Sequence, residues 1–175
     1  MELKKIIRRF LVPAPVTTLY CLFKFKAKVS PKAEVELSPL LSIGRNTTIG
    51  SFAKTKATTG PLTIGRDVNI SNNCTIMATE GGIEIGDDCM IASNVVIIGN
   101  SYNYTDLNTP TRLQGEISKG VKIGNNVWIG ANSVILDGTI IEDGVIISPL
   151  SLVSGKVKKN AIISGNPAKT IFTRR

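Results

Sequence analysis

The stretch VKIGNNVWIGANSVILDGTIIEDGVIISPLSLVSG, residues 121–155, places an aliphatic residue at every sixth position. These residues are Ile123, Ile129, Ile135, Ile141, Ile147 and Val153. An amphipathic helix would repeat apolar residues about every 3.6 positions and a half-buried strand about every 2, so neither fits. A fixed period of this kind predicts a solenoid of short stacked strands.

The same period runs through the chain upstream of this stretch. It is carried by Ile43, Ile49, Ile64, Ile70, Ile76, Ile85, Ile91 and Ile97. The fifth position of each hexad is small or β-branched, and glycine often follows the aliphatic residue, which suits a sharp turn. Three flat faces close a triangular coil of roughly 18 residues, and coils stack at about 4.8 Å. We therefore predict an all-β solenoid of about five triangular coils.

Three segments interrupt the repeat. Two are short, near residues 55–63 and near Glu80 to Gly82, and the third is an extended loop over residues 99–120. The long loop includes the polar and aromatic sequence SYNYTDLNTPTRLQG. Because insertions do not serve the stack, they are candidates for function.

Charge is distributed unevenly along the chain. Residues 1–32 contain eight Lys or Arg and one Glu, and residues 156–175 contain six basic residues and no acid. The intervening residues contain seven basic and twelve acidic residues, so acidic partners would meet the ends first. We expect a basic helical and lead-in segment over residues 1–32 and a solenoid domain over residues 33–175.

The first twelve residues have the pattern of an amphipathic helix. Apolar residues at helical spacing alternate with basic ones: Leu3, Ile6, Ile7, Phe10 and Leu11 against Lys4, Lys5, Arg8 and Arg9. Such a helix either lies on an anionic membrane surface or packs against the solenoid. Pro13 and Pro15 interrupt the apolar tract and no cleavage site follows, so we predict neither a signal peptide nor a membrane span. We expect a cytoplasmic protein, with peripheral membrane contact through residues 1–12 as one alternative.

Other function classes are disfavoured by composition. Cys21, Cys74 and Cys89 show no paired spacing, which indicates buried thiols rather than a disulfide framework or a zinc site. The chain has no phosphate-cradling glycine motif, and no basic face interleaved with aromatic residues indicates nucleic-acid binding. It also contains no histidine, the side chain used most often to move protons at neutral pH.

Two motifs resemble a known family. VKIGNNVWIGANSVIL at 121–136 and IISGNPAKTIFTRR at 162–175 are similar to sugar acetyltransferases of the hexapeptide-repeat acyltransferases, which are left-handed parallel β-helices. The resemblance implies a homotrimer with active sites between neighbouring prisms and acetyl-CoA or a related acyl-CoA as donor. It also implies a sugar or amino-sugar acceptor, in surface polysaccharide or sugar-nucleotide metabolism. We expect no metal. The carbonic anhydrases of this architecture hold zinc with three histidine ligands, and this chain contains no histidine.

The resemblance also indicates where the donor binds. It assigns the acyl-CoA to Trp128, Gly130, Ala131, Ser148, Pro149, Gly165, Pro167 and Lys169, the last three lying beyond a break in the hexad register at Ile162 and Ile163. The ammonium of Lys169 suits a phosphate. The structural alternatives are that Trp128 covers a corner, that the glycines serve turns and that Lys169 is simply solvated.

The extended loop resembles the NHNYxD…P…Q segment of polysaccharide-modifying members, in which the histidine is the general base. The chain keeps Asn103, Tyr104, Asp106, Pro110 and Gln114, and Tyr102 stands where the histidine belongs. A one-residue slip of the alignment would place Asn103 there instead, and neither is a histidine. With a pKa of about 10, tyrosine is ionised in roughly one molecule per thousand at pH 7, so it is a poor base. The resemblance implies Tyr102 and Asp106 as catalytic residues and Glu80, Asn103, Tyr104 and Gln114 on the acceptor side.

Three hypotheses remain open at the level of the sequence. The chain is an acyltransferase that uses Asp106, Glu80 or an ionised Tyr102, or that depends on the acceptor's own amine, which is already nucleophilic. Alternatively it is a binding or scaffold protein that keeps the CoA cleft without turnover. In the third hypothesis the histidine of an active parent has been replaced.

Overall fold

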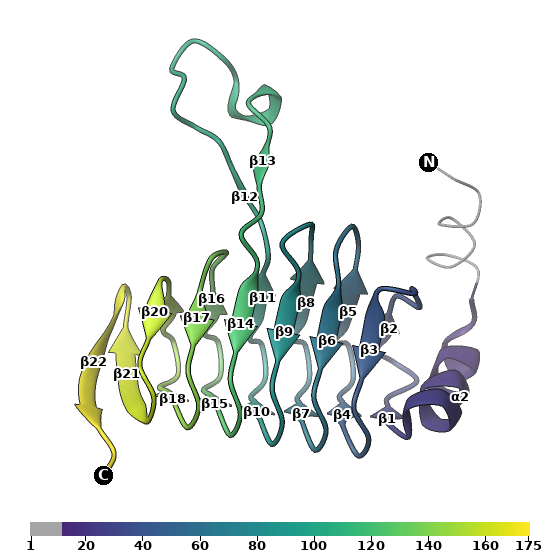
Figure 1. The fold of residues 1–175 in the computed structure, drawn as a ribbon. Coiled ribbons are helices and arrows are strands. Elements are labelled where there is room, and N and C mark those ends of the chain that lie inside the picture. The colour runs from purple at the N-terminus through teal and green to yellow at the C-terminus, as the bar shows by residue number, and fades with distance from the viewer. Residues whose placement is uncertain (1–11) are drawn as a thin grey trace.

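The computed structural model describes residues 12–175 and shows a triangular prism built from stacked turns of chain (Figure 1). The segment 1–11, which carries most of the expected amphipathic helix, lies outside the described residues. Within residues 12–175, no helix is both long and apolar enough to cross a membrane.

One α-helix closes the N-terminal end of the prism (Figure 1). Helix α2 (Ala14–Phe25) follows Pro13, whose φ of −62° and ψ of 141° are extended, and Pro15 lies in its first turn, where a missing N–H costs nothing. It ends at Lys26 in the left-handed conformation, and the next N–H, that of Ala27, reaches back to the carbonyl of Cys21 at 3.3 Å. Only Thr17 and Cys21 of the helix are fully buried, and they face the first turn of the prism.

The strands form three parallel sheets, which we name A, B and C. Sheet A contains β1 (Lys28–Val29), β4 (Thr48–Ile49), β7 (Asn69–Ile70), β10 (Met90–Ile91), β15 (Trp128–Ile129), β18 (Ile146–Ile147), β21 (Ala161–Gly165) and the antiparallel β22 (Ala168–Thr173). Sheet B contains β2 (Glu34–Val35), β5 (Lys54–Ala57), β8 (Thr75–Ala78), β11 (Val96–Ile98), β16 (Val134–Ile135) and β19 (Leu152–Val153). Sheet C contains β3 (Leu41–Ile43), β6 (Leu62–Ile64), β9 (Ile83–Ile85), β14 (Val121–Ile123), β17 (Ile140–Ile141) and β20 (Lys156–Val157). Each turn visits the sheets in the order A, B, C, so the corners are A/B, B/C and C/A.

The hexad residues form the core, as the period predicted. Along sheet A, Ile70 pairs with Ile91, Ile91 with Ile129, and Ile129 with Ile147, and all four are at most 1% exposed. The fifth-position residues are buried beside them, including the polar Ser133 and Thr139, whose hydroxyls bond to backbone carbonyls. The predicted fold class, a left-handed parallel β-helix, is confirmed. The prism has six turns rather than five, because the first turn is built on Val29 and Val35, which the isoleucine count omits.

All three interruptions of the repeat fall at the B/C corner. In the C-terminal half, Trp128 pairs with Ile146, a step of 18 residues, whereas Thr48 pairs with Asn69 and Asn69 with Met90, steps of 21. The three extra residues loop out at the B/C corner in the second and third turns, and the long loop leaves from the same corner in the fourth. Sequence insertions are thus confined to one edge of the prism.

The glycines after the aliphatic residues serve close approach rather than turn conformation. A Cβ on Gly124 would lie 2.5 Å from the carboxylate of Asp143 in the next turn, and that carboxylate accepts the N–H of Asn125 at 2.7 Å. The left-handed residue of this corner is Asn126, with φ of 52°. The expectation that glycine supplies the turn geometry is corrected here, since asparagine and aspartate supply it at most corners.

Candidate active site

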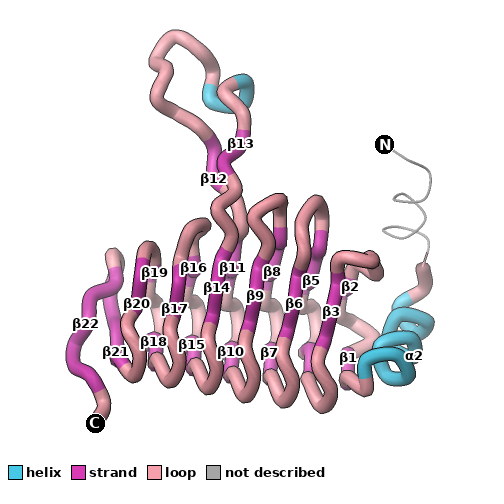
Figure 2. Tube along the Cα trace, in the orientation of Figure 1, coloured by secondary structure: helices cyan, strands magenta, loops and turns pink. Residues whose placement is uncertain are grey.

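The long loop folds as an arm with a rigid root. Strands β12 (Ser101–Tyr102) and β13 (Glu116–Ile117) pair antiparallel, and a short 3-10 helix, Thr111–Leu113, lies near the tip (Figure 2). At the root, the hydroxyls of Thr79 and Ser118 both donate to the carbonyl of Gly99 at 2.7 Å. Where the chain returns to the prism, the carboxylate of Asp137 accepts the backbone N–H groups of Lys119 and Gly120 at 2.9 and 2.7 Å. The arm therefore leaves the prism in a fixed direction.

Two of the predicted site residues organise the tip of the arm. The side chain of Gln114 accepts the N–H of Asp106 at 3.1 Å and donates to the carbonyls of Asp106 and Thr109 at 2.7 and 2.6 Å. The carboxylate of Asp106 accepts the hydroxyl of Thr109 at 2.6 Å and the N–H of Asn108 at 2.9 Å. These two bonds lower the pKa of the Asp106 carboxyl, with the Thr109 hydroxyl as the larger cause. A carboxylate stabilised in its ionised form is a weaker base, so the geometry favours a structural role for Asp106.

The arm extends away from the prism (Figure 1), and several of its large side chains are exposed to solvent. Tyr104 is 73% exposed, Leu107 95% and Leu113 60%. No part of the described chain covers them. Apolar side chains held out on an ordered arm indicate contact with something outside this chain.

Tyr102 and Glu116 lie directly opposite each other on the two strands of the arm. Opposed residues of an antiparallel pair share one face of the ribbon, with Cβ atoms about 5 Å apart. The side-chain amide of Asn100 donates to the Glu116 carboxylate at 2.9 Å and orients it. Glu116 was missed in the sequence because no motif marks it, although an antiparallel return of the loop would have placed it beside Tyr102.

Glu80 lies one turn earlier, at the same corner as the root of the arm. The N–H of its neighbour Gly81 donates to the hydroxyl of Ser118 at 2.7 Å. The side chain of Glu80 is exposed. The structure thus brings Glu80 to the root of the arm, and Asn103, whose amide donates to the carbonyl of Gln114 at 3.2 Å, to the arm itself.

The residues assigned to the donor gather at the A/B corner of the last turns. The first three are Trp128, Gly130 and Ala131, and one turn on, Ser148 and Pro149 lie beside them. The N–H of Leu150 donates to the carbonyl of Ala131 at 2.9 Å, and a Cβ on Gly130 would lie 2.5 Å from the nitrogen of Pro149. Trp128 is 45% exposed on the outer side of sheet A.

The tail joins the same corner. Strands β21 and β22 form a hairpin through Gly165 and Pro167, and the N–H of Gly165 donates to the Ser151 hydroxyl at 3.3 Å. The register shifts between Ile162 and Ile163, where the sequence showed a break. Lys169 is exposed on β22. All the predicted donor residues therefore lie at one end of one edge of the prism.

The donor and acceptor groups occupy different corners of the same chain. The donor residues lie at the A/B corner, and Glu80, Tyr102, Asn103, Tyr104, Asp106 and Gln114 lie at the B/C corner or on its arm. Sheet B separates the two corners. The described chain therefore does not assemble the two predicted halves of the site by itself.

A groove runs along the outer side of sheet C at the root of the arm. It encloses about 590 Å³ and is lined by Gly81, Gly82, Lys119, Lys122 and Ile140, among others. Lys122 pairs with Glu84 at 3.2 Å. Lys119 follows strand β13 at the root of the arm and adds a second positive charge to the groove.

The three cysteines, Cys21, Cys74 and Cys89, are buried free thiols. Burial raises the pKa of the Cys21 and Cys89 thiols to about 11, so both are protonated at neutral pH. Over residues 12–175, no three His, Cys, Asp or Glu side chains are grouped so that they could hold a metal ion.

Two family profiles match the chain. Residues 120–155 match the profile described as bacterial transferase hexapeptide (six repeats), and residues 61–98 match the hexapeptide repeat of succinyl-transferase. Among curated proteins, none matches the chain significantly.

Solved structures of acyltransferases share the fold. AntD, an N-acyltransferase from Bacillus cereus in complex with dTDP and 3-hydroxybutyryl-CoA, is 26% identical with a TM-score of 0.75, over 86% of this chain and 81% of that one. A variant of AntD in complex with dTDP-4-amino-4,6-dideoxyglucose and coenzyme A has a TM-score of 0.73 at 26% identity, over 85% and 81%. A maltose O-acetyltransferase from Clostridium difficile 630 is 26% identical with a TM-score of 0.60, over 85% and 67%. The two profiles and these structures support a hexapeptide-repeat acyltransferase, as the sequence resemblance implied.

Proposed function

We propose that this protein transfers an acyl group from acyl-CoA to the amine of a nucleotide-linked amino sugar. The observation that carries this choice is Tyr102, which stands at the position of the usual general base in a chain without histidine. A hydroxyl acceptor needs a base to become nucleophilic, whereas a neutral amine already is. Amine transfer is also the activity named for AntD, which was solved with a 4-amino sugar nucleotide.

The proposed reaction balances without a metal or a redox partner. The amine nitrogen attacks the thioester carbonyl, a C–N bond forms and the C–S bond breaks. The coenzyme A thiolate leaves and takes up one proton, and the nitrogen loses one. We propose that Glu116, opposite Tyr102 and oriented by Asn100, accepts the proton from nitrogen.

We propose that the donor lies along the A/B corner of the last turns. Trp128 supplies an exposed aromatic surface and Ala131 a small, partly exposed side chain beside it. Gly130 is buried, and its missing Cβ lets the next turn approach closely at this corner. Lys169, exposed on the tail, is available for a phosphate at the nucleotide end. Acetyl-CoA is the simplest donor, and 3-hydroxybutyryl-CoA is the donor bound by AntD.

We propose that the groove at the root of the arm receives the nucleotide part of the acceptor. Lys119 lines the groove just after strand β13, and a diphosphate is a natural partner for its charge. Glu80 and Tyr104 would contact the sugar from the corner and the arm. These assignments give the acceptor a binding region separate from the donor corner.

The assembly that unites the two corners is a homotrimer. On the outer side of sheet B, strands β8 to β19 carry apolar residues, namely Met77, Val96, Ile98, Val134 and Leu152, whereas the N-terminal strands β2 and β5 carry the charged Glu34, Lys54 and Lys56. The outer side of sheet C is more polar, with Thr63, Glu84, Lys122 and Lys156. If three parallel prisms turn sheet B toward a threefold axis, the B/C corner of one chain meets the A/B corner of the next. This arrangement places each arm beside the donor residues of a neighbour.

The proposal is tested with purified protein, acyl-CoA and paired acceptors. We expect release of free thiol from acetyl-CoA or 3-hydroxybutyryl-CoA with a dTDP-linked amino sugar, and little with the same sugar carrying a hydroxyl. Preferred transfer to the hydroxyl sugar would favour O-acylation of polysaccharide precursors instead. Tight binding of coenzyme A with no transfer to either sugar would favour the scaffold hypothesis. An arm-shortened variant serves as the inactive control.

A further inference from the structure

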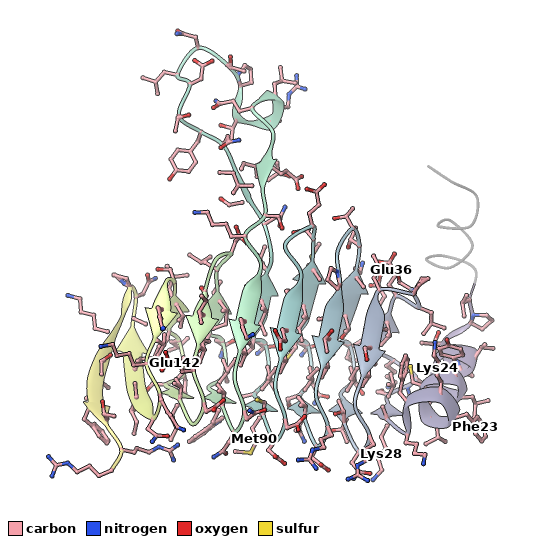
Figure 3. All side chains as sticks on the ribbon, viewed as in Figure 1. Phe23, Lys24, Lys28, Glu36, Met90 and Glu142 are labelled. Atoms are coloured by element: carbon pink, nitrogen blue, oxygen red, sulfur yellow. The ribbon has the colours of Figure 1, made fainter. Side chains whose placement is uncertain are left out.

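We propose that the outward face of helix α2 docks the protein on an anionic lipid surface. The helix has an unusual distribution of side chains: its buried face carries the small Thr17 and Cys21, and its large apolar residues point outward. Val16 is 50% exposed, Leu19 52% and Phe23 78%. Figure 3 shows Phe23 directed away from the prism at its N-terminal end.

The outward residues form one continuous stripe. Positions 16, 19, 20 and 23 follow the i, i+3, i+4, i+7 spacing of a single helix face, occupied by Val16, Leu19, Tyr20 and Phe23, and Leu22 flanks it at 45% exposure. A helix that is apolar on both faces is normally covered on both. In the described structure the prism covers only one of them.

Positive charge lies near the C-terminal end of the stripe and in the first turn of the prism after it. Lys24, Lys26, Lys28 and Lys32 are all exposed, and no acidic residue occurs between Val12 and Ala33. The side chain of Lys24 lies 5.1 Å from the ring centres of Tyr20 and Phe25. Apolar and aromatic side chains next to several lysines suit the boundary between acyl chains and anionic headgroups, where the apolar groups contact the acyl chains and the lysines contact the headgroups.

The charge also decides between occupants. A second copy that used the same face would bring two groups of lysines together, and like charges repel. An anionic bilayer instead attracts each lysine near its surface. Helix α2 lies at the N-terminal end of the prism, next to β1 of sheet A (Figure 1). In the proposed homotrimer all three helices would face the same membrane, so three weak contacts would act together.

The test is cosedimentation of the full-length protein with vesicles. We expect binding to vesicles of phosphatidylglycerol and phosphatidylcholine at low salt, a steep loss of binding with added salt, and little binding to phosphatidylcholine alone. Phe23→Ser should weaken binding about tenfold or more. Phe172→Ser is the matched control, because Phe172 is 55% exposed at the opposite end of the prism and should change binding by less than about twofold.

A second variant keeps the helix core untouched. Lys24→Gln combined with Lys28→Gln should reduce binding to anionic vesicles and flatten its salt dependence, because both side chains are exposed. Absence of binding at low salt contradicts the proposal, and so does binding that Phe23→Ser leaves unchanged, which would assign the contact to residues 1–11. Acyl transfer in solution is measured separately, so failure here is distinguishable from failure of the proposed function.

Discussion

The prism and the arm of this protein obey different rules of burial. In the prism, the repeated isoleucines such as Ile97 and Ile129 are fully buried and every strand pairs with the turns beside it. In the arm, hydrogen bonds from the Gln114 side chain hold the backbone near the tip, but Tyr104, Leu107 and Leu113 are mostly exposed. The arm is therefore ordered without being packed.

This contrast separates residues that hold the fold from residues that meet something else. The burial of an apolar side chain in the prism is explained by packing within its own chain. The exposure of an apolar side chain on an ordered but uncovered arm is explained by contact with a partner. The predictions below test that division, beginning with the largest effect.

Removing the same number of carbon atoms should have very different consequences in the two regions. We expect Ile97→Ala to lower the free energy of unfolding by about 2–5 kcal/mol, since it opens a cavity in a closely packed core. Leu107→Ala, at a position 95% exposed, should change it by less than about 0.5 kcal/mol. Denaturant unfolding measures both values, and a large loss from Leu107→Ala would mean that the arm packs on its own prism.

Restoring the usual base should alter chemistry without altering the fold. We predict that Tyr102→His raises acyl transfer to a hydroxyl acceptor by about 10² or more, in line with the contribution of a general base. Transfer to an amine should change much less. Steady-state kinetics with both acceptors measure the effect.

Tyr102→Phe is the companion to that substitution. It removes only the hydroxyl and should leave both amine transfer and coenzyme A affinity close to their original values. If it abolishes transfer, tyrosine is itself catalytic and the account of a lost base is wrong.

The prism was predictable from the sequence because its physics is local and repetitive. Ile64, Ile85 and Ile123 each recur for the same reason, so a period of six residues indicates the fold, the core and the inward positions together. The first turn was missed in the count because Val29 and Val35 lack the isoleucine and glycine signature. A helical segment was expected within residues 1–32 and was assigned to residues 1–12, whereas the structure shows helix α2 at Ala14–Phe25.

The candidate site was only partly predictable. The resemblance located Trp128 and Ala131, and the structure brings them to one corner with the tail. Glu116 could not be found, because its position opposite Tyr102 depends on how the arm returns. Asp106 matched a motif, yet its bonds to Thr109 and Asn108 indicate a structural role that spacing alone does not reveal.

A smaller effect is expected at the root of the arm, where the two regions meet. Lys119→Gln should raise the KM of a nucleotide-linked amino sugar about five- to tenfold with little change in kcat, because one charge contact to a diphosphate is lost. The matching free amino sugar should be unaffected. Lys158→Gln, an exposed lysine at the C/A corner, is the control, and equal effects from both variants would exclude a specific role for the groove.

The smallest effect concerns the order of the arm tip as a function of pH. Because the pKa of Asp106 is lowered in the folded arm, its contribution is complete above the ordinary value of 3.8 and is lost as pH falls through the lowered value. We therefore expect the amide resonances of Asn108 and Thr109 to be unchanged from neutral pH to about pH 4 and to shift only at lower pH. Asp106→Ala should release the tip at every pH. A transition near neutral pH would contradict this assignment.

The most direct test of the account asks whether one site is built by two chains. One variant has residues 103–115 replaced by Asn-Gly, a two-residue turn that suits the β12–β13 hairpin. The other carries Ala131→Trp, which fills the donor corner. Each should be inactive alone, and each should sediment as a trimer of the 18.7 kDa chain. After subunit exchange in a one-to-one mixture, an intact arm meets an intact neighbouring corner at about a quarter of the interfaces, so about a quarter of the parent activity should return. If no activity returns although mixed trimers form, both halves of the site belong to one chain and the account is contradicted.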